Sequence, residues 1–299
     1  MQEHKKIAEN FLTQAKLDLT IKDILPLKGG VSSNMSHIVL LNNDSLSSFV
    51  VRSHPELKGV SKRINLEDEA KILKTLELTN VPVPEVYAFE KNYIIMEYVA
   101  ATPFYKNKCT KQYIENYAAA LAHLHMSGVI VEDVSMSSMQ QRIDLKLNES
   151  QRPLDTSLQE ELIRETITKH ASQINSARNV FLHSDMWPGN VLVDDKFNVQ
   201  AVVDWEEPLV GDPLWDLSIC QLEFLWLFGK EASQYLTNCY FEITQYSRLN
   251  LRYYDLLVSI RPFGRLPIWH SGLKDIGRSD ISLKEMIDKH HSFVGGALK

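Results

Sequence analysis

The most informative part of this sequence is FLHSDMWPGNVLVDDKFNVQAVVDWEEPLVGDPLWDL, residues 181–217. It begins with a short apolar segment and continues into a loop that contains His183, Asp185 and Asn190. Two β-branched segments follow, and a short polar turn separates them, which is the pattern of a β-hairpin. The second segment ends at Asp204. The hairpin is therefore expected to bring Asp185, Asn190 and Asp204 to the same end of a small sheet.

The oxygen atoms of these three side chains suit a hard cation. Asn190 and Asp204 offer an amide oxygen and a carboxylate, which Mg²⁺ takes alongside substrate phosphates. Asp185 is then free to orient a nucleophile. The pattern predicts phosphoryl transfer, with Asp185 as the catalytic residue and Asn190 and Asp204 as the metal ligands. Acidic loop residues more often cap turns and helices. We assign that ordinary role to Asp194, Asp195 and Asp212.

The stretch resembles the aminoglycoside phosphotransferase family of small-molecule kinases, which has macrolide, choline and homoserine kinase relatives. The family signature is His-Gly-Asp-x-x-x-x-Asn, then a strand ending in Asp-Trp-Glu, then Gly-Asp-Pro-x-x-Asp. This chain has the signature at residues 183–190, 204–206 and 211–216, with Ser184 in the place of the glycine. The resemblance implies that His183 and Asp216 support the catalytic loop.

The same resemblance implies an α+β, two-lobed protein-kinase-like fold. Residues 1–99 would form a small antiparallel-sheet N-lobe that binds the nucleotide. Residues 100–299 would form a mainly helical C-lobe with the catalytic loop and the acceptor site. Within the C-lobe, the nearly wholly apolar segment 213–228 predicts a buried helix. Ser157 followed by Glu160 is a capping-box pattern, so a further helix is expected to begin at Ser157.

The N-terminal third carries the residues that we expect to bind a nucleotide. Arg52 ends a predicted strand, and Glu69 lies at the edge of the inward face of a helix over residues 65–78, so the two are expected to pair. By resemblance, Arg52 stands where kinases have a lysine that holds phosphates, and residues 93–99 form the hinge that contacts adenine. A glycine-bearing loop near the start of the strand meander can lay its N–H groups over phosphates, although the full GxGxxG spacing is absent. The loop and hinge positions are Gly29, Gly30, Ser32, Ser33, Met96, Glu97 and Val99.

Composition and length narrow the class of protein. The 299 residues carry a net charge of −6, which argues against nucleic acid as a partner because phosphate backbones need a basic surface. The three cysteines are widely spaced and predict neither a disulfide framework nor a zinc site. The N-terminus lacks the apolar core of a signal peptide, and the most apolar segment, 217–228, is too short to span a bilayer. We expect a cytoplasmic protein without a membrane partner, as a monomer or weak dimer.

The acceptor is predicted to be a small molecule. Only six residues separate Asp204 from Gly211, which leaves no room for the long segment that docks a peptide in protein kinases. Glu206, Glu207 and Glu223, together with the net negative charge, suit a cationic acceptor. An aminoglycoside-like antibiotic, and hence antibiotic resistance, is the first expectation. A locally basic C-terminal region argues against a cationic acceptor. Its basic residues are Arg261, Arg265, His270, Lys274 and Arg278.

Two alternatives remain open at the level of the sequence. One is a metabolite kinase of the choline, ethanolamine or homoserine type, with ATP or GTP as the donor and Mg²⁺ as the cofactor. The other is a nucleotide-binding regulator without catalysis, which the departures at Arg52 and Ser184 suggest. The complete set of Asp185, Asn190 and Asp204 argues against the regulator, because a protein that does not catalyse has no need of all three.

Overall fold

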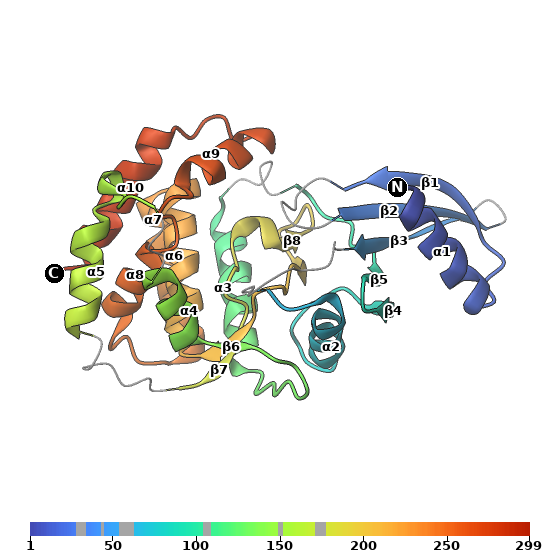
Figure 1. Ribbon diagram of the computed structural model, residues 1–299, viewed down its shortest axis with the longest axis horizontal. Helices are drawn as coiled ribbons and strands as arrows, with labels where there is room; N and C mark the ends of the chain where they lie inside the picture. The colour runs from blue at the N-terminus through green and yellow to red at the C-terminus, as the bar shows by residue number, and fades with distance from the viewer. Residues whose placement is uncertain (28–33, 43–44, 54–62, 104–108, 149–151, 171–177) are drawn as a thin grey trace.

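An antiparallel sheet of five strands forms the N-terminal part of the computed structural model (Figure 1). Its strand order is β1-β2-β3-β5-β4. The strands are β1 Thr20–Pro26, β2 Asn34–Asn42, β3 Ser45–Ser53, β4 Val86–Glu90 and β5 Tyr93–Glu97. The structure describes residues 1–27, 34–42, 45–53, 63–103, 109–148, 152–170 and 178–299.

The two faces of this sheet pack against different helices. Successive residues of a strand point to opposite faces. Phe49 and Val51 of β3 pack with α1 (Gln2–Gln14), whereas Val50 joins the core that contains α2 (Leu66–Leu76). Arg52 shares the face of Val50. The strand period therefore turns Arg52 toward α2 and the centre of the molecule.

Helices make up most of the C-terminal part, as the mixed α+β prediction required. The helix α6 (Leu214–Phe228) is buried along nearly its whole length, which agrees with its apolar sequence. The other helices are α3 Lys111–Met126, α4 Met139–Leu147, α5 Glu160–His170, α7 Lys230–Thr244, α8 Leu251–Ser259, α9 Leu266–Asp275 and α10 Leu283–Ala297. Short strands complete this part: β6 Ser137–Ser138, β7 Val180–Leu182, β8 Val191–Val193, β9 Val199–Val202 and β10 Leu209–Gly211. The predicted kinase-like fold is confirmed, while the division at residue 99 stays a prediction.

The hairpin of β8 and β9 joins the two parts. It has the predicted antiparallel pairing, and Asp194 closes its turn by accepting the backbone N–H groups of Lys196 and Asn198. Backbone hydrogen bonds tie the hairpin to the segment between α2 and β4 and to the segment after β5, because Val202 donates to Pro82 and Thr102 donates to Val193, each at 2.8 Å. The end of this hairpin is thus held at the junction of the sheet and the helices.

The predicted helix start at Ser157 is wrong. Residues Thr156–Leu158 form a single 3₁₀ turn, Gln159 takes a left-handed conformation at φ 58°, and α5 begins at Glu160. The Glu160 carboxylate does not cap the helix at Ser157. It accepts hydrogen bonds from Arg152 at 2.7 and 2.9 Å and from Arg164 at 2.7 Å. These charged partners outweigh a local cap.

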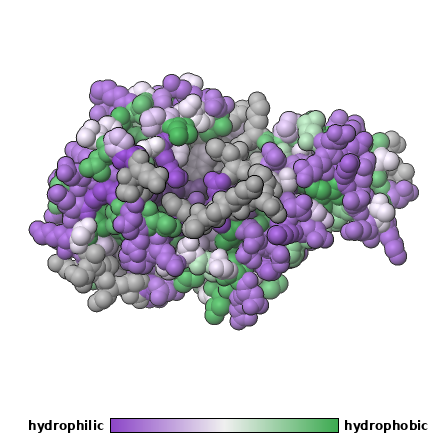
Figure 2. Space-filling model, in the orientation of Figure 1, coloured by the Kyte–Doolittle hydropathy of each residue, from purple (hydrophilic) through white to green (hydrophobic). Residues whose placement is uncertain are grey.

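The face shown in Figure 2 is mostly hydrophilic, with hydrophobic residues in small groups between polar ones. Among the helices of the described ranges, none combines the length and the apolar character that crossing a bilayer requires.

Candidate active site

The predicted catalytic loop is held from below by Asp216. This carboxylate is fully buried at the start of α6 and accepts the backbone N–H groups of His183 and Ser184, each at 2.8 Å. Ser184 has φ 65°, the left-handed region that favours glycine. A glycine adopts this conformation without strain, which explains the glycine in the family signature. In this chain a serine adopts the same left-handed conformation.

His183 and Asn190 connect the loop to the end of the hairpin. His183 Nδ1 accepts the N–H of Asp185 at 3.2 Å, so its Nε2 carries the proton and donates to the Val203 carbonyl at 2.9 Å. Asn190 Nδ2 donates to the Asp185 carbonyl at 2.9 Å, and the Val203 N–H donates to the Asn190 carbonyl at 2.9 Å. The structure thus brings Asp185, Asn190 and the residue before Asp204 together, as the hairpin spacing predicted.

His125 is a supporting residue that the sequence analysis missed. It lies in α3 and is buried, with Nε2 3.3 Å from Asp216 Oδ2 and Nδ1 2.7 Å from the Tyr240 hydroxyl. The catalytic loop, Asp216, His125 and Tyr240 form one buried chain of contacts. The local sequence did not reveal this role, because the two partners of His125 are 91 and 115 residues away.

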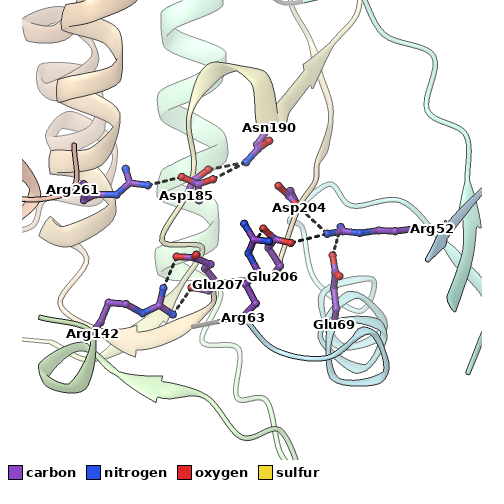
Figure 3. Close-up of polar contacts among 10 residues, drawn as sticks. All are labelled: Arg52, Arg63, Glu69, Arg142, Asp185, Asn190, Asp204, Glu206, Glu207 and Arg261. Carbon is purple, nitrogen blue, oxygen red and sulfur yellow. Dashed lines mark hydrogen bonds and ion pairs between the residues drawn. The ribbon is translucent and has the colours of Figure 1, made fainter. Parts of the chain in front are cut away.

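Arg52 sits at the centre of one group of charges, here called the Arg52 group (Figure 3). Its Nη1 lies 2.6 Å from Glu69 Oε1, and its Nη2 lies 2.8 Å from Asp204 Oδ1 and 3.2 Å from Glu206 Oε2. Glu206 also meets Arg63 Nε at 2.9 Å. The side chains of Arg52 and Glu69 are 3% and 2% exposed, so this pair is almost out of contact with solvent.

The carboxylates of the Arg52 group are crowded. Burial raises the pKa of Glu69 to about 7, although the charge of Arg52 works in the opposite direction. Burial and the charge of Asp204 raise the pKa of Glu206 to about 7 as well. Arg52 and Arg63 together face three carboxylates, so the group has a net negative charge when all three are ionised.

A second group of charges, here called the Arg261 group, lies on the other side of the loop (Figure 3). Arg261 follows α8, and its Nη2 is 2.5 Å from Asp185 Oδ1, while its Nη1 is 4.0 Å from Glu223 Oε1. Arg142 of α4 places Nη1 2.5 Å from Glu207 Oε2. Burial raises the pKa of Asp185, and it raises the pKa of Glu223 to about 7.

The three residues expected to bind a cationic acceptor are therefore not together. Glu206 turns to Arg52 and Arg63, whereas Glu207, its neighbour in sequence, turns to Arg142. Glu223 approaches Arg261. Each of the three glutamates lies beside an arginine. The sequence pattern pointed to Arg261 as part of a basic region, but it did not point to Arg142.

The predicted hinge lies at the end of β5. Met96 is buried in the core, and the Glu97 N–H donates to the Glu85 carbonyl at 2.8 Å. Val99 is half-buried just beyond the strand. Tyr98 stacks on His37 of β2 with ring centroids 3.6 Å apart. The predicted phosphate-loop residues lie outside the described residues: Gly29, Gly30, Ser32 and Ser33.

Asn190 and Asp204 could hold a divalent cation. Asp204 has φ 69°, and its side chain remains 30% exposed. Its Oδ1 contacts Arg52, and Oδ2 is the second oxygen that the carboxylate can offer to a cation. Asn190 uses its amide nitrogen toward Asp185, so its amide oxygen is the available ligand atom. Within the part of the chain that the structure describes, no cluster of three or more His, Cys, Asp or Glu side chains could hold a metal. A carboxylate and an amide oxygen are ligands that fit a hard cation, which would take its other ligands from phosphates and water.

Comparisons with solved structures give the same architecture. A choline kinase, LicA, from Streptococcus pneumoniae superposes with a TM-score of 0.66 at 20% identity over 100% of this chain and 99% of that chain. A macrolide 2'-phosphotransferase, MphH, from Brachybacterium faecium gives 0.63 at 18% identity over 97% of both chains. A spectinomycin phosphotransferase solved with ADP and spectinomycin gives 0.60 at 15% identity, again over 97% of both. At these identities the likeness shows the fold.

No functionally curated protein gave a significant match to the sequence. A family model described as the phosphotransferase enzyme family matches residues 23–243. That range includes Arg52, Glu69, the catalytic loop, Asp204 and α6. On the strength of this match, the chain belongs to the phosphotransferase enzyme family.

Proposed function

We propose that this enzyme transfers the γ-phosphoryl group of ATP or GTP to a hydroxyl of a small molecule, with Mg²⁺ as its cofactor. The observation that carries the proposal is the convergence of Asp185, Asn190 and Asp204 at the end of the β8–β9 hairpin. Residues 1–99 would bind the nucleotide and residues 100–299 the acceptor. Three free cysteines suit the reducing cytoplasm: Cys109, Cys220 and Cys239.

In this mechanism Asp185 orients the acceptor hydroxyl and accepts its proton. The hydroxyl oxygen forms a bond to the γ-phosphorus, and the bond from that phosphorus to the β,γ-bridging oxygen breaks, so the nucleoside diphosphate leaves with the electron pair. Because the transition state is loose, positioning contributes more than basicity. When bound to Asn190 and Asp204, Mg²⁺ would neutralise negative charge on the phosphates.

The nucleotide is proposed to lie between the hinge and the Arg52 group. Met96, Glu97 and Val99 would contact the base. Arg52 would serve in place of the usual lysine, since a guanidinium can bind carboxylate and phosphate oxygens at the same time. Its Nη2 already bridges Asp204 and Glu206, which places positive charge beside the proposed metal ligand.

The contacts on the acceptor side favour a metabolite over an aminoglycoside-like antibiotic. Glu207 pairs with Arg142, and Glu223 lies 4.0 Å from Arg261, so the two carboxylates do not form one shared acidic surface for a polycation. A nucleotide-binding regulator without catalysis is disfavoured by the geometry of the loop, where Asn190 holds the Asp185 carbonyl.

A coupled assay of ATP and GTP consumption tests the proposal. The acceptor panel contains aminoglycosides, macrolides, choline, ethanolamine and homoserine, and hydrolysis without acceptor is recorded. Asp185→Ala and Asp204→Ala should each lower turnover by roughly a thousandfold or more. Asp195→Ala is the matched control, because this aspartate is exposed in the turn of the same hairpin. Retained turnover in Asp204→Ala would refute the assignment.

A further inference from the structure

The carboxylate of Asp185 is already engaged before any acceptor arrives. Arg261 Nη2 is 2.5 Å from Oδ1, and Asn190 Nδ2 is 3.5 Å from Oδ2. Asn190 is fixed in the loop by its hydrogen bond to the Asp185 carbonyl. Burial raises the pKa of Asp185, but the charge of Arg261 opposes protonation, and its guanidinium occupies the Oδ1 atom that an acceptor hydroxyl would have to reach. Arg261 is therefore the group that must give way before Asp185 can take a proton.

Arg261 is placed where it can exchange partners. It lies in the turn that follows α8, and its side chain is 18% exposed, while that of Asp185 is 33% exposed. The guanidinium lies over the ring of Trp269 at 5.8 Å, which keeps the side chain anchored when its polar partner changes. A planar guanidinium binds a carboxylate through two parallel hydrogen bonds. The carboxylate of a ligand could therefore take the place of Asp185 as the hydrogen-bond partner of Arg261.

The charges nearby disfavour an acceptor that carries only positive charge. Two arginines, Arg142 and Arg261, lie beside the acidic residues of this side. A cation would have to displace a guanidinium that is already hydrogen-bonded, or stand next to it. A carboxylate on the acceptor would bind Arg261 directly. Glu223, at 4.0 Å from Arg261, would remain available for a positive group on the same molecule.

We propose that the acceptor is a hydroxyl compound that carries a carboxylate, and that this carboxylate takes Arg261 away from Asp185. The inference rests on the proposed phosphotransferase function and adds the substrate class. Binding of the acceptor then frees the base. Asp185 takes the hydroxyl proton as the oxygen bonds to the γ-phosphorus, and the nucleoside diphosphate leaves with the electrons of the broken P–O bond. Only an acceptor that has both the hydroxyl and the carboxylate releases Asp185 and then reacts, so the choice of substrate is coupled to catalysis.

Calorimetric titration of the full chain, saturated with Mg²⁺ and AMP-PNP, tests this exchange. The probes are pairs that differ by a carboxylate alone: L-homoserine with 3-amino-1-propanol, L-serine with ethanolamine, and glycerate with ethane-1,2-diol. The carboxylated member of at least one pair should bind at least about tenfold more tightly. Arg261→Gln should abolish this preference, and Arg261→Lys should restore part of it. Arg248→Gln, an exposed arginine that contacts Asn238, is the matched control and should keep the preference.

The outcomes separate this inference from the proposed function. Equal or tighter binding of the decarboxylated members, or binding of neither member of any pair, would refute the proposal that the acceptor carries a carboxylate. A loss of AMP-PNP affinity in Arg261→Gln with unchanged acceptor preference assigns Arg261 to the nucleotide and also overturns it. Failure of the unmodified protein to bind AMP-PNP at all would instead refute the phosphotransferase function.

Discussion

The Arg52 group and the Arg261 group have the same composition but different connectivity. Each contains three carboxylates and two arginines. In the Arg52 group a single buried guanidinium contacts all three acids, whereas in the Arg261 group the contacts divide between Arg142 and Arg261. Glu206 and Glu207 are adjacent in sequence and belong to different groups (Figure 3).

This difference separates a fixed side of the site from an exchangeable one. Arg52 joins β3, α2 and the segment after β9, and its side chain is nearly inaccessible, so it cannot change partners without opening the structure. Arg261 can change partners, because both it and Asp185 reach solvent. Burial alone thus predicts a preorganised Arg52 group and an Arg261 group that can rearrange.

The largest expected effect is the loss of stability when Arg52 is removed. Arg52→Met leaves Glu69 and two further carboxylates without their shared partner, and breaking a buried ion pair in this way costs about 3–5 kcal/mol. Arg261→Met removes a partly exposed guanidinium and should cost less than half of that. Urea unfolding followed by tryptophan fluorescence measures both. Equal losses would show that the two groups do not differ in rigidity.

A second variant sharpens the same measurement. Adding Glu69→Gln to Arg52→Met should recover part of the loss, because it removes the most buried of the stranded carboxylates. Arg52→Lys keeps the charge but loses the fork that reaches three acids, so it should fall between the wild type and Arg52→Met. An Arg52→Lys protein as unstable as Arg52→Met would mean that geometry, and not charge, holds the group together.

The pH dependence of stability should show the elevated pKa of Glu223. Burial raises this pKa from an ordinary value near 4.5 to about 7, so the folded state binds a proton that the unfolded state has already lost in this interval. The stability from Glu223 is therefore fully present below pH 4.5 and is lost as the pH rises through 7, by on the order of 3 kcal/mol. Glu223→Gln should flatten the slope of unfolding free energy between pH 5 and 8.

The control for this experiment is Glu165→Gln, an exposed residue of α5 that should leave the slope of the wild type unchanged. Glu69→Gln extends the test to the Arg52 group, where it should also flatten the slope but lower stability at every pH, because Arg52 loses its shortest contact. A slope unchanged in Glu223→Gln would place the titrating carboxyl elsewhere.

Local sequence pattern predicted the parts of the site that lie close together in the chain. The hairpin spacing placed Asp185, Asn190 and Asp204, and strand and helix periods placed Arg52 opposite Glu69. These features depend on geometry that repeats over a few residues. Local pattern therefore sufficed to predict which of these side chains lie together, while their roles in the reaction stay predictions.

The remaining features depend on partners that are remote in sequence. Nothing in the dipeptide Glu206-Glu207 shows that its two side chains diverge, because Arg52 and Arg142 come from different parts of the fold. The pairing of Arg261 with Asp185 spans 76 residues. At Glu160 the capping-box pattern did not form, because the carboxylate pairs with Arg152 and Arg164. Tertiary ion pairs, and not propensities, set these details.

The smallest expected effect concerns the backbone beside Asp185. Ser184 is held at φ 65° only because Asp216 binds its N–H, and a left-handed serine costs roughly 1–2 kcal/mol relative to glycine. Its buried hydroxyl has no hydrogen-bond partner among the described residues. After subtraction of the entropy that glycine adds to the unfolded chain, Ser184→Gly should stabilise the fold by about 1 kcal/mol in urea unfolding.

Lys16→Gly provides the matched comparison, since Lys16 has φ 54° but is exposed and lies outside both charge groups. It relieves backbone strain without removing a buried hydroxyl, so it should gain less than Ser184→Gly. A Ser184→Gly protein that is more stable yet loses most of its turnover would show that the serine hydroxyl acts on the Arg261 side of the site. A protein that gains stability and keeps its turnover would show that Asp216 fixes the conformation of the loop and that the Ser184 hydroxyl has no role in the reaction.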